Sequence, residues 1–165
     1  MLKRKVYQEL LKWKENTEGK ALCIIGARQI GKTTLIRKFG KNEYEHFAEI
    51  NFVTDEKAAD IFKDKLTAEA IITNLTAYLQ TPLEPGKTLI LFDEVQECPA
   101  VRSAIKFLVE DGRFDYIESG SLLGVRYKEV RSYPVGFEQI LPMYPLDFEE
   151  YLWANGVQDK VMLRE

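Results

Sequence analysis

The sequence predicts an α/β protein: a three-layer sandwich in which helices cover both faces of a mainly parallel, five-stranded sheet. Short apolar runs, typical of buried parallel strands, alternate with longer segments whose apolar side chains recur at helical spacing. A glycine-rich loop stands between the first apolar run and the helix that follows it. With 165 residues the chain is long enough for a single core, and we expect residues 1–165 to form one domain.

Five segments are predicted to be strands, joined by right-handed crossovers. Residues Ala21–Ile25 and 88–92 are continuously apolar, which indicates strands buried on both faces. Residues 46–53 and 114–118 are the second and fourth candidates. The fifth, 141–145, contains prolines that cannot donate to a neighbouring strand, so we expect it at an edge of the sheet.

Helices are predicted where apolar residues recur every three or four positions. An amphipathic helix near the N-terminus, within residues 1–18, carries Val6 and Leu10 on one face. The helix after the glycine-rich loop is expected to end before Gly40, because glycine commonly terminates helices. The predicted helical segments are 3–16, 33–39, 55–63, 67–80, 100–110 and Phe148–Ala154.

Residues 26–33 fit the pattern G-x-x-x-x-G-K-[ST] at every fixed position. A predicted strand before the loop and a helix after it make the match specific for a P-loop, which binds nucleotide phosphates. Glycine lets the backbone turn its N–H groups inward, and the start of the helix adds free N–H donors. The predicted phosphate-binding residues are Gly26, Ala27, Arg28, Gln29, Ile30, Gly31, Lys32, Thr33 and Thr34.

Four side chains of this segment have individual interpretations. Lys32 places an ammonium group on the β- and γ-phosphates, and we count it among the catalytic residues. Thr33 offers a hydroxyl to Mg²⁺. Arg28 contacts phosphate, a neighbouring subunit or solvent, and the sequence does not decide among the three. Thr34 lies beyond the motif, where a capping or packing role is the alternative to nucleotide binding.

Two carboxylates, Asp93 and Glu94, directly follow the apolar run 88–92. Ligands bind at the C-terminal ends of parallel strands, so we expect both side chains to face the P-loop. Asp93 is predicted to hold Mg²⁺ together with Thr33. Glu94 is predicted to orient the attacking water as a catalytic residue. Gln96 either helps to position that water or is structural.

Small polar residues end the fourth predicted strand, at Ser119 and Ser121. A hydroxyl at this strand tip would reach the γ-phosphate or the water, so one of the two serines is predicted as a catalytic sensor of phosphate. The alternative is that Ser-Gly-Ser only forms a turn.

With these elements placed, the chain resembles the AAA-type ATPases that are labelled "ATP-binding protein" and carry a C-terminal domain of unknown function. The resemblance covers nearly the whole chain and rests on the N-terminal helix that ends in Leu11-Lys12-Trp13 and on residues 26–34, 50–52, 91–96, 119–123 and 144–152. It implies a P-loop NTPase sheet of the additional-strand type, with the phosphate-loop strand in the middle and the sensor strand between it and the acidic strand. It also implies ATP, with Mg²⁺, as the nucleotide.

The resemblance has two departures. Relatives continue into a C-terminal domain, so residues 147–165 are expected to lead into a domain that is absent here. Many relatives also carry Gly-Arg before the last strand, where this chain has Gly136-Phe137. An arginine that acts on a neighbouring subunit is therefore unassigned, with Arg126 and Arg131 as substitutes and surface arginines as the default interpretation.

Composition excludes several other classes of protein. A net charge of −3 and a pI of about 5.4 argue against a broad basic surface for nucleic acid. Cys23 lies in an apolar run, neither it nor Cys98 has metal-ligand spacing, and a cytoplasmic location fits this usage. No apolar run approaches the roughly 20 residues of a membrane span.

The leading hypothesis is therefore Mg-dependent ATP binding and hydrolysis. An ATP-dependent binding switch with negligible turnover is the first alternative, and a small-molecule kinase, which would need an acceptor pocket and a lid, is the second. Beyond the nucleotide, the partners left open are a second copy of the chain, the missing C-terminal domain and nucleic acid. The residues give nucleic acid no support.

Overall fold

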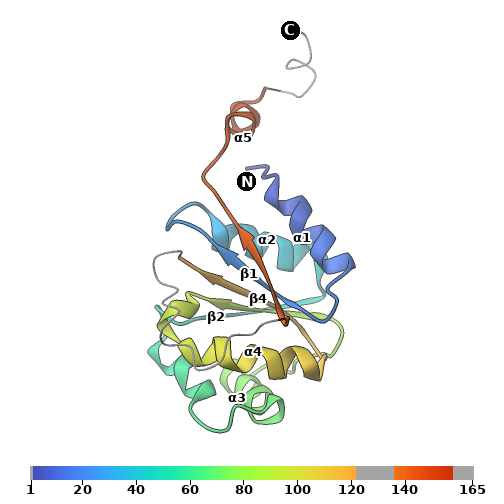
Figure 1. The fold of residues 1–165 in the computed structure, drawn as a ribbon, viewed down its shortest axis with the longest axis vertical. Coiled ribbons are helices and arrows are strands. Elements are labelled where there is room, and N and C mark those ends of the chain that lie inside the picture. Colours follow the sequence, from blue (N-terminus) through green and yellow to red (C-terminus); the bar gives the residue numbers. More distant parts are fainter. Residues whose placement is uncertain (1, 122–135, 158–165) are drawn as a thin grey trace.

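The structure is a computed structural model that describes residues 2–121 and 136–157. Within these ranges, the five strands form one parallel sheet in the order β2-β3-β4-β1-β5. Helices cover both of its faces (Figure 1), so the predicted three-layer α/β sandwich is confirmed. The strands are β1 (Ala21–Ile25), β2 (His46–Asn51), β3 (Thr88–Asp93), β4 (Asp115–Gly120) and β5 (Glu138–Pro142).

Two of the expectations about strand order hold, and one is wrong. The serine-bearing strand β4 lies between β1 and β3, as the resemblance implied, and β5 is an edge strand. The phosphate-loop strand β1 was expected in the middle, but β4 occupies that position. Strand β1 lies next to this central strand, with β5 as its outer neighbour at the sheet edge.

The helices fall close to the predicted segments. The segment predicted at 55–63 is helical but of the tighter 3₁₀ type, over Glu56–Phe62, which we label η1. A second 3₁₀ turn, η2 (Val95–Glu97), follows β3. The α-helices are α1 (Val6–Glu15), α2 (Lys32–Glu43), α3 (Ala68–Leu79), α4 (Pro99–Asp111) and α5 (Phe148–Ala154).

Each face of the sheet has its own apolar core. Helices α1 and α2 cover one face, and α3 and α4 cover the other (Figure 1). Alternation along each strand assigns side chains to the two cores: Leu22 and Ile24 face α1 and α2, whereas Ala21 faces α3 and α4. Because both faces are covered, β3 is buried along its whole length.

Helix α2 was expected to end before Gly40, and that prediction is wrong, since the helix continues to Glu43. A Cβ atom at Gly40 would lie 2.3 Å from Cδ2 of Phe47 in β2. The glycine is therefore required by close approach of the helix to the sheet, which outweighs its lower helix propensity of about 1 kcal/mol.

Helix α5 projects beyond the sheet, next to the N-terminal segment (Figure 1). Its residues Phe148 and Tyr151 are 76% and 55% exposed. Among the described residues, no helix is long and apolar enough to cross a membrane.

Candidate nucleotide-binding site

The P-loop connects β1 to α2 on the C-terminal side of the sheet. Gly31 has φ of 90°, a left-handed conformation that favours glycine, and Gln29 also has a positive φ of 60°. Gly26 is confined for a different reason: a Cβ atom there would lie 2.3 Å from the carbonyl oxygen of Met143, just after β5. The first glycine of the motif is thus required by the close approach of the segment that follows β5.

Lys32 lies against the inside of this loop. Its side chain is 6% exposed, and Nζ donates to the carbonyl oxygens of Gly26, at 3.0 Å, and Ala27. Burial lowers the pKa of Lys32, while the carboxylates of Glu94 and Asp93 act in the opposite direction. The ammonium group is therefore close to both acids as well as to the loop.

The Asp93 side chain collects hydrogen bonds from three different elements. The Thr33 hydroxyl at the start of α2 donates to Oδ2 at 2.9 Å, and the Ser119 hydroxyl of β4 donates to Oδ1 at 2.8 Å. Asn51, the last residue of β2, donates to Oδ2 from Nδ2 at 3.1 Å. These contacts fix a carboxylate that is 1% exposed directly opposite the P-loop helix.

Glu94 leaves the strand in a different direction. It has a left-handed backbone, with φ of 59° and ψ of 47°, and its carboxylate accepts a hydrogen bond from Nε2 of Gln96. The side chain lines a groove of about 520 Å³ together with Arg28 and Gln29 of the P-loop. Gln96 thereby fixes the carboxylate that we expect to orient water.

The remaining predicted residues differ in how they relate to this cluster. Ser119, not Ser121, contacts Asp93, although both are buried. Thr34 is exposed on α2, and so are Ala27, Arg28 and Gln29 in the loop. Arg126 and Arg131 lie outside the described residues.

Asn51 was not assigned a role from the sequence. Its Oδ1 accepts hydrogen bonds from the backbone N–H groups of Val53 and Thr54, which leaves Nδ2 directed at Asp93. The signal was its position, since Asn51 ends a parallel strand and pairs in register with Asp93.

The donor set suits a divalent cation of the Mg²⁺ type. Mg²⁺ prefers oxygen ligands and is usually held by one or two protein groups plus phosphate oxygens and water. The Thr33 hydroxyl and the Asp93 carboxylate, already 2.9 Å apart, are such oxygens. Both groups lie at the end of the P-loop, where Lys32 is also located.

A profile of the AAA domain family matches residues 18–152. The chain belongs to this family. The matched region includes the P-loop, the acidic tip of β3, both serines at the end of β4 and all of β5. The family resemblance inferred from the sequence is thereby confirmed.

Solved structures share the fold at low sequence identity. The Pif1 helicase from Candida albicans is 15% identical with a TM-score of 0.54, and the match covers 92% of this chain and 42% of that one. A variant of RuvB from Thermotoga maritima is 16% identical with a TM-score of 0.51, covering 95% and 53%. These likenesses support a P-loop NTPase fold for this AAA domain.

The chain spans about half the length of the Pif1 and RuvB structures, 42% and 53% respectively. A match to Drosophila ORC, described as bound to AT-rich DNA and Cdc6, covers 95% of this chain but 62% of that one, at 10% identity and a TM-score of 0.49. Among curated protein sequences, none matches the chain significantly.

Proposed function

We propose that this AAA domain binds ATP with Mg²⁺ between the P-loop and the tip of β3, and hydrolyses it with Glu94. One observation carries the proposal: the hydroxyls of Thr33 and Ser119 both donate to Asp93, next to Lys32. A loop for phosphate, oxygen ligands for the cation and a nearby carboxylate for water thus share one end of the sheet.

Each residue then has a defined task. Loop N–H groups and Lys32 bind the phosphates, and Thr33 and Asp93 would hold Mg²⁺, which neutralises phosphate charge. Glu94 accepts a hydrogen bond from the attacking water and thereby directs a lone pair of the water oxygen towards the γ-phosphorus. Ser119 orients Asp93 and senses the γ-phosphate. Catalysis of this type depends on positioning and charge stabilisation rather than on a covalent step.

Two variants test the proposal by calorimetry with Mg·ATP and by steady-state phosphate release. Lys32→Ala should remove detectable binding, because it deletes the ammonium from the phosphate loop. Glu94→Gln should bind Mg·ATP like the wild type and lose turnover by about 100-fold or more, the usual contribution of a general base. Undiminished phosphate release from the glutamine variant would remove Glu94 from this role.

The same assays separate the alternatives. Tight Mg·ATP binding by the wild type with negligible phosphate release would favour a binding switch, and phosphate transferred to an acceptor would indicate a kinase. We include in the proposal a cytoplasmic location, a C-terminal domain that follows α5, and assembly with further copies. Turnover that rises with protein concentration would support assembly. Nucleic acid binding is not part of the proposal, because nothing in this site requires it.

A further inference from the structure

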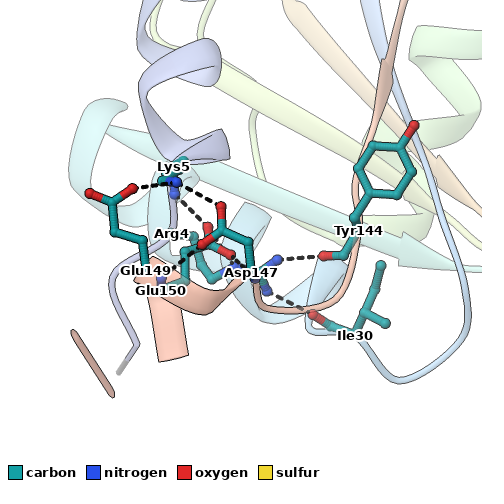
Figure 2. Close-up of polar contacts among 7 residues, drawn as sticks. All are labelled: Arg4, Lys5, Ile30, Tyr144, Asp147, Glu149 and Glu150. Atoms are coloured by element: carbon teal, nitrogen blue, oxygen red, sulfur yellow. Dashed lines mark hydrogen bonds and ion pairs between the residues drawn. The ribbon is translucent and has the colours of Figure 1, made fainter. Parts of the chain in front are cut away.

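Arg4 joins three parts of the chain that are distant in sequence (Figure 2). Its Nη1 donates to the carbonyl oxygen of Ile30 at 3.1 Å, and its Nη2 donates to that of Tyr144 at 2.6 Å. Nε forms an ion pair with Oε1 of Glu150 at 3.2 Å. A single planar guanidinium group therefore contacts the P-loop, the segment after β5 and helix α5 at once.

The contact with Ile30 joins Arg4 to the backbone of the P-loop. Ile30 immediately precedes Gly31, whose left-handed backbone makes the last turn of the P-loop. Arg4 thus holds a peptide group of the loop, at a different carbonyl from the two that Lys32 contacts. It touches the backbone of the loop and has no place in the chemistry proposed above.

The contact with Glu150 places the other end of Arg4 at the start of α5. The side chains of Arg4 and Glu150 are 9% and 6% exposed, so this ion pair is largely desolvated. Glu150 also accepts hydrogen bonds from the backbone N–H groups of Lys5, at 2.8 Å, and Asp147, at 3.1 Å. Together with the bond from Glu150 N–H to Asp147, this completes a capping box that begins the helix.

Lys5 joins the same two elements in a different way. Its ammonium pairs with Asp147 at 2.7 Å and with Glu149, and its side chain is 47% exposed. Exposed pairs of this kind contribute little because solvent screens them. Lys5 thus links the N-terminal segment to α5 without contacting the P-loop, which makes it a matched control for Arg4.

We propose that Arg4 is a positioning residue that couples the P-loop to helix α5. When a triphosphate binds, the loop orders around it, and the Ile30 carbonyl, Arg4 and Glu150 transmit that ordering to the start of α5. Any segment that follows α5 would then respond to the nucleotide. The inference rests on the proposed function only in requiring that the P-loop binds Mg·ATP.

A purely structural role for Arg4 would also predict loss of stability on substitution, because breaking a buried ion pair is costly. The two roles differ in one measurable quantity, which is the change in α5 caused by the nucleotide. Backbone hydrogen exchange of residues 148–154, measured with and without Mg·ATP, gives that quantity as a ratio of rates.

In the wild type, Mg·ATP should slow exchange in α5 by about 5-fold or more, the lower range of coupling between two sites. Arg4→Lys keeps a positive charge near Glu150 but cannot form the fork to both carbonyls, so its ratio should fall towards 1. Lys5→Ala should exchange faster with and without nucleotide, yet keep the wild-type ratio. Glu150→Gln, which breaks the link from the other side, should lose the ratio as well.

Calorimetry on the same samples separates the two proposals. Binding of Mg·ATP to the wild type with no change in α5 exchange would overturn the coupling alone, and so would an Arg4→Lys ratio equal to that of the wild type. If the wild type does not bind Mg·ATP, the proposed function fails and the coupling fails with it.

Discussion

Strand β4 carries two contrasting polar sites on its opposite faces. Ser119 points towards α1 and α2 and donates to Asp93, whose carboxylate is held by side chains from several elements. Glu118, one residue earlier, points to the other face and is 0% exposed. Among residues 2–121 and 136–157, neither of its carboxylate oxygens has a hydrogen-bond partner. Within the described part of the chain, one face thus holds a carboxylate with several hydrogen-bond donors and the other holds a carboxyl group with none.

Glu118 is surrounded by groups from three other elements. Sγ of Cys23 in β1 and carboxylate oxygens of Glu138 in β5 and of Glu118 all lie within 4.8 Å of one another. Arg102 of α4 forms an ion pair with Glu138 at 2.8 Å. Burial raises the pKa of Glu118 well above its usual range, the Glu138 carboxylate adds to this, and Arg102 opposes it. Cys23, interpreted from sequence as a core residue, is fully buried, and burial likewise raises the pKa of its thiol.

The comparison shows that burial alone does not make an acid functional. Asp93 lies at the C-terminal ends of the strands, where hydroxyl and amide donors converge on it. Glu118 lies beside Arg102 of α4, whose guanidinium group is paired with Glu138. The first arrangement suits a cation and phosphate, whereas the second favours a carboxyl group that keeps its proton.

The largest effect on this comparison should come from Arg102→Met. The change leaves Glu118 and Glu138 buried together without their cation, and breaking a buried ion pair costs about 3–5 kcal/mol. Urea unfolding at pH 7 measures the loss. Arg113→Met is the control, because Arg113 pairs with Asp111 and Glu69 at the surface, where about 1 kcal/mol or less is expected. Equal losses in both variants would contradict the buried-cluster account.

Glu118→Gln should have a smaller and opposite effect. Below the pKa of a glutamate in the unfolded chain, about 4.3, Glu118 is protonated in both the folded and the unfolded state, and the substitution changes the free energy of unfolding little. As pH rises above that value, the unfolded chain releases the proton while the folded protein retains it, so the wild type loses stability. At pH 7 the variant should therefore be more stable by about 1–3 kcal/mol. The difference in urea midpoint between the variant and the wild type should grow from pH 4 to pH 8. A difference that stays constant with pH would refute the claim that folded Glu118 retains its proton.

The smallest effect should come from the two serines at the C-terminal end of β4, Ser119 in the strand and Ser121 just after it. Ser119→Ala removes the hydroxyl that donates to Asp93, so we expect Mg·ATP turnover to fall about 10-fold, equal to about 1.4 kcal/mol. Ser121→Ala is the matched control and should change turnover by less than about 2-fold, because in the described part of the chain its buried hydroxyl does not contact Asp93. Steady-state phosphate release decides between them, and a reversed order would move the sensor role to Ser121.

Much of this site was predictable because its parts are local in sequence. The P-loop is one continuous motif, and the strand before it was predicted with the bounds that the structure has. Asp93 could be placed because an apolar run followed by acids indicates the C-terminal end of a buried strand. That Ser119 contacts Asp93 follows once β4 lies beside β3.

The rest depends on contacts between distant segments, which periodicity does not encode. The predicted fifth strand began at residue 141, whereas β5 begins at Glu138, a charged residue that pairs with Arg102 under α4. Gly40 was predicted to end a helix, because its close contact with the Phe47 side chain cannot be inferred from the sequence. Arg4 belonged to a charged helical segment, and its link to Glu150 exists only in the folded chain.

The closeness of Gly26 to the Met143 carbonyl affects how mutants of the motif should be interpreted. A side chain at position 26 would push against the end of an edge strand before it met any ligand. Loss of nucleotide affinity in such a mutant would therefore report displacement of β5 as much as a missing phosphate contact. Spectroscopic comparison of the ligand-free mutant with the wild type would reveal the displacement, and substitution of Lys32 gives a cleaner measure of phosphate recognition.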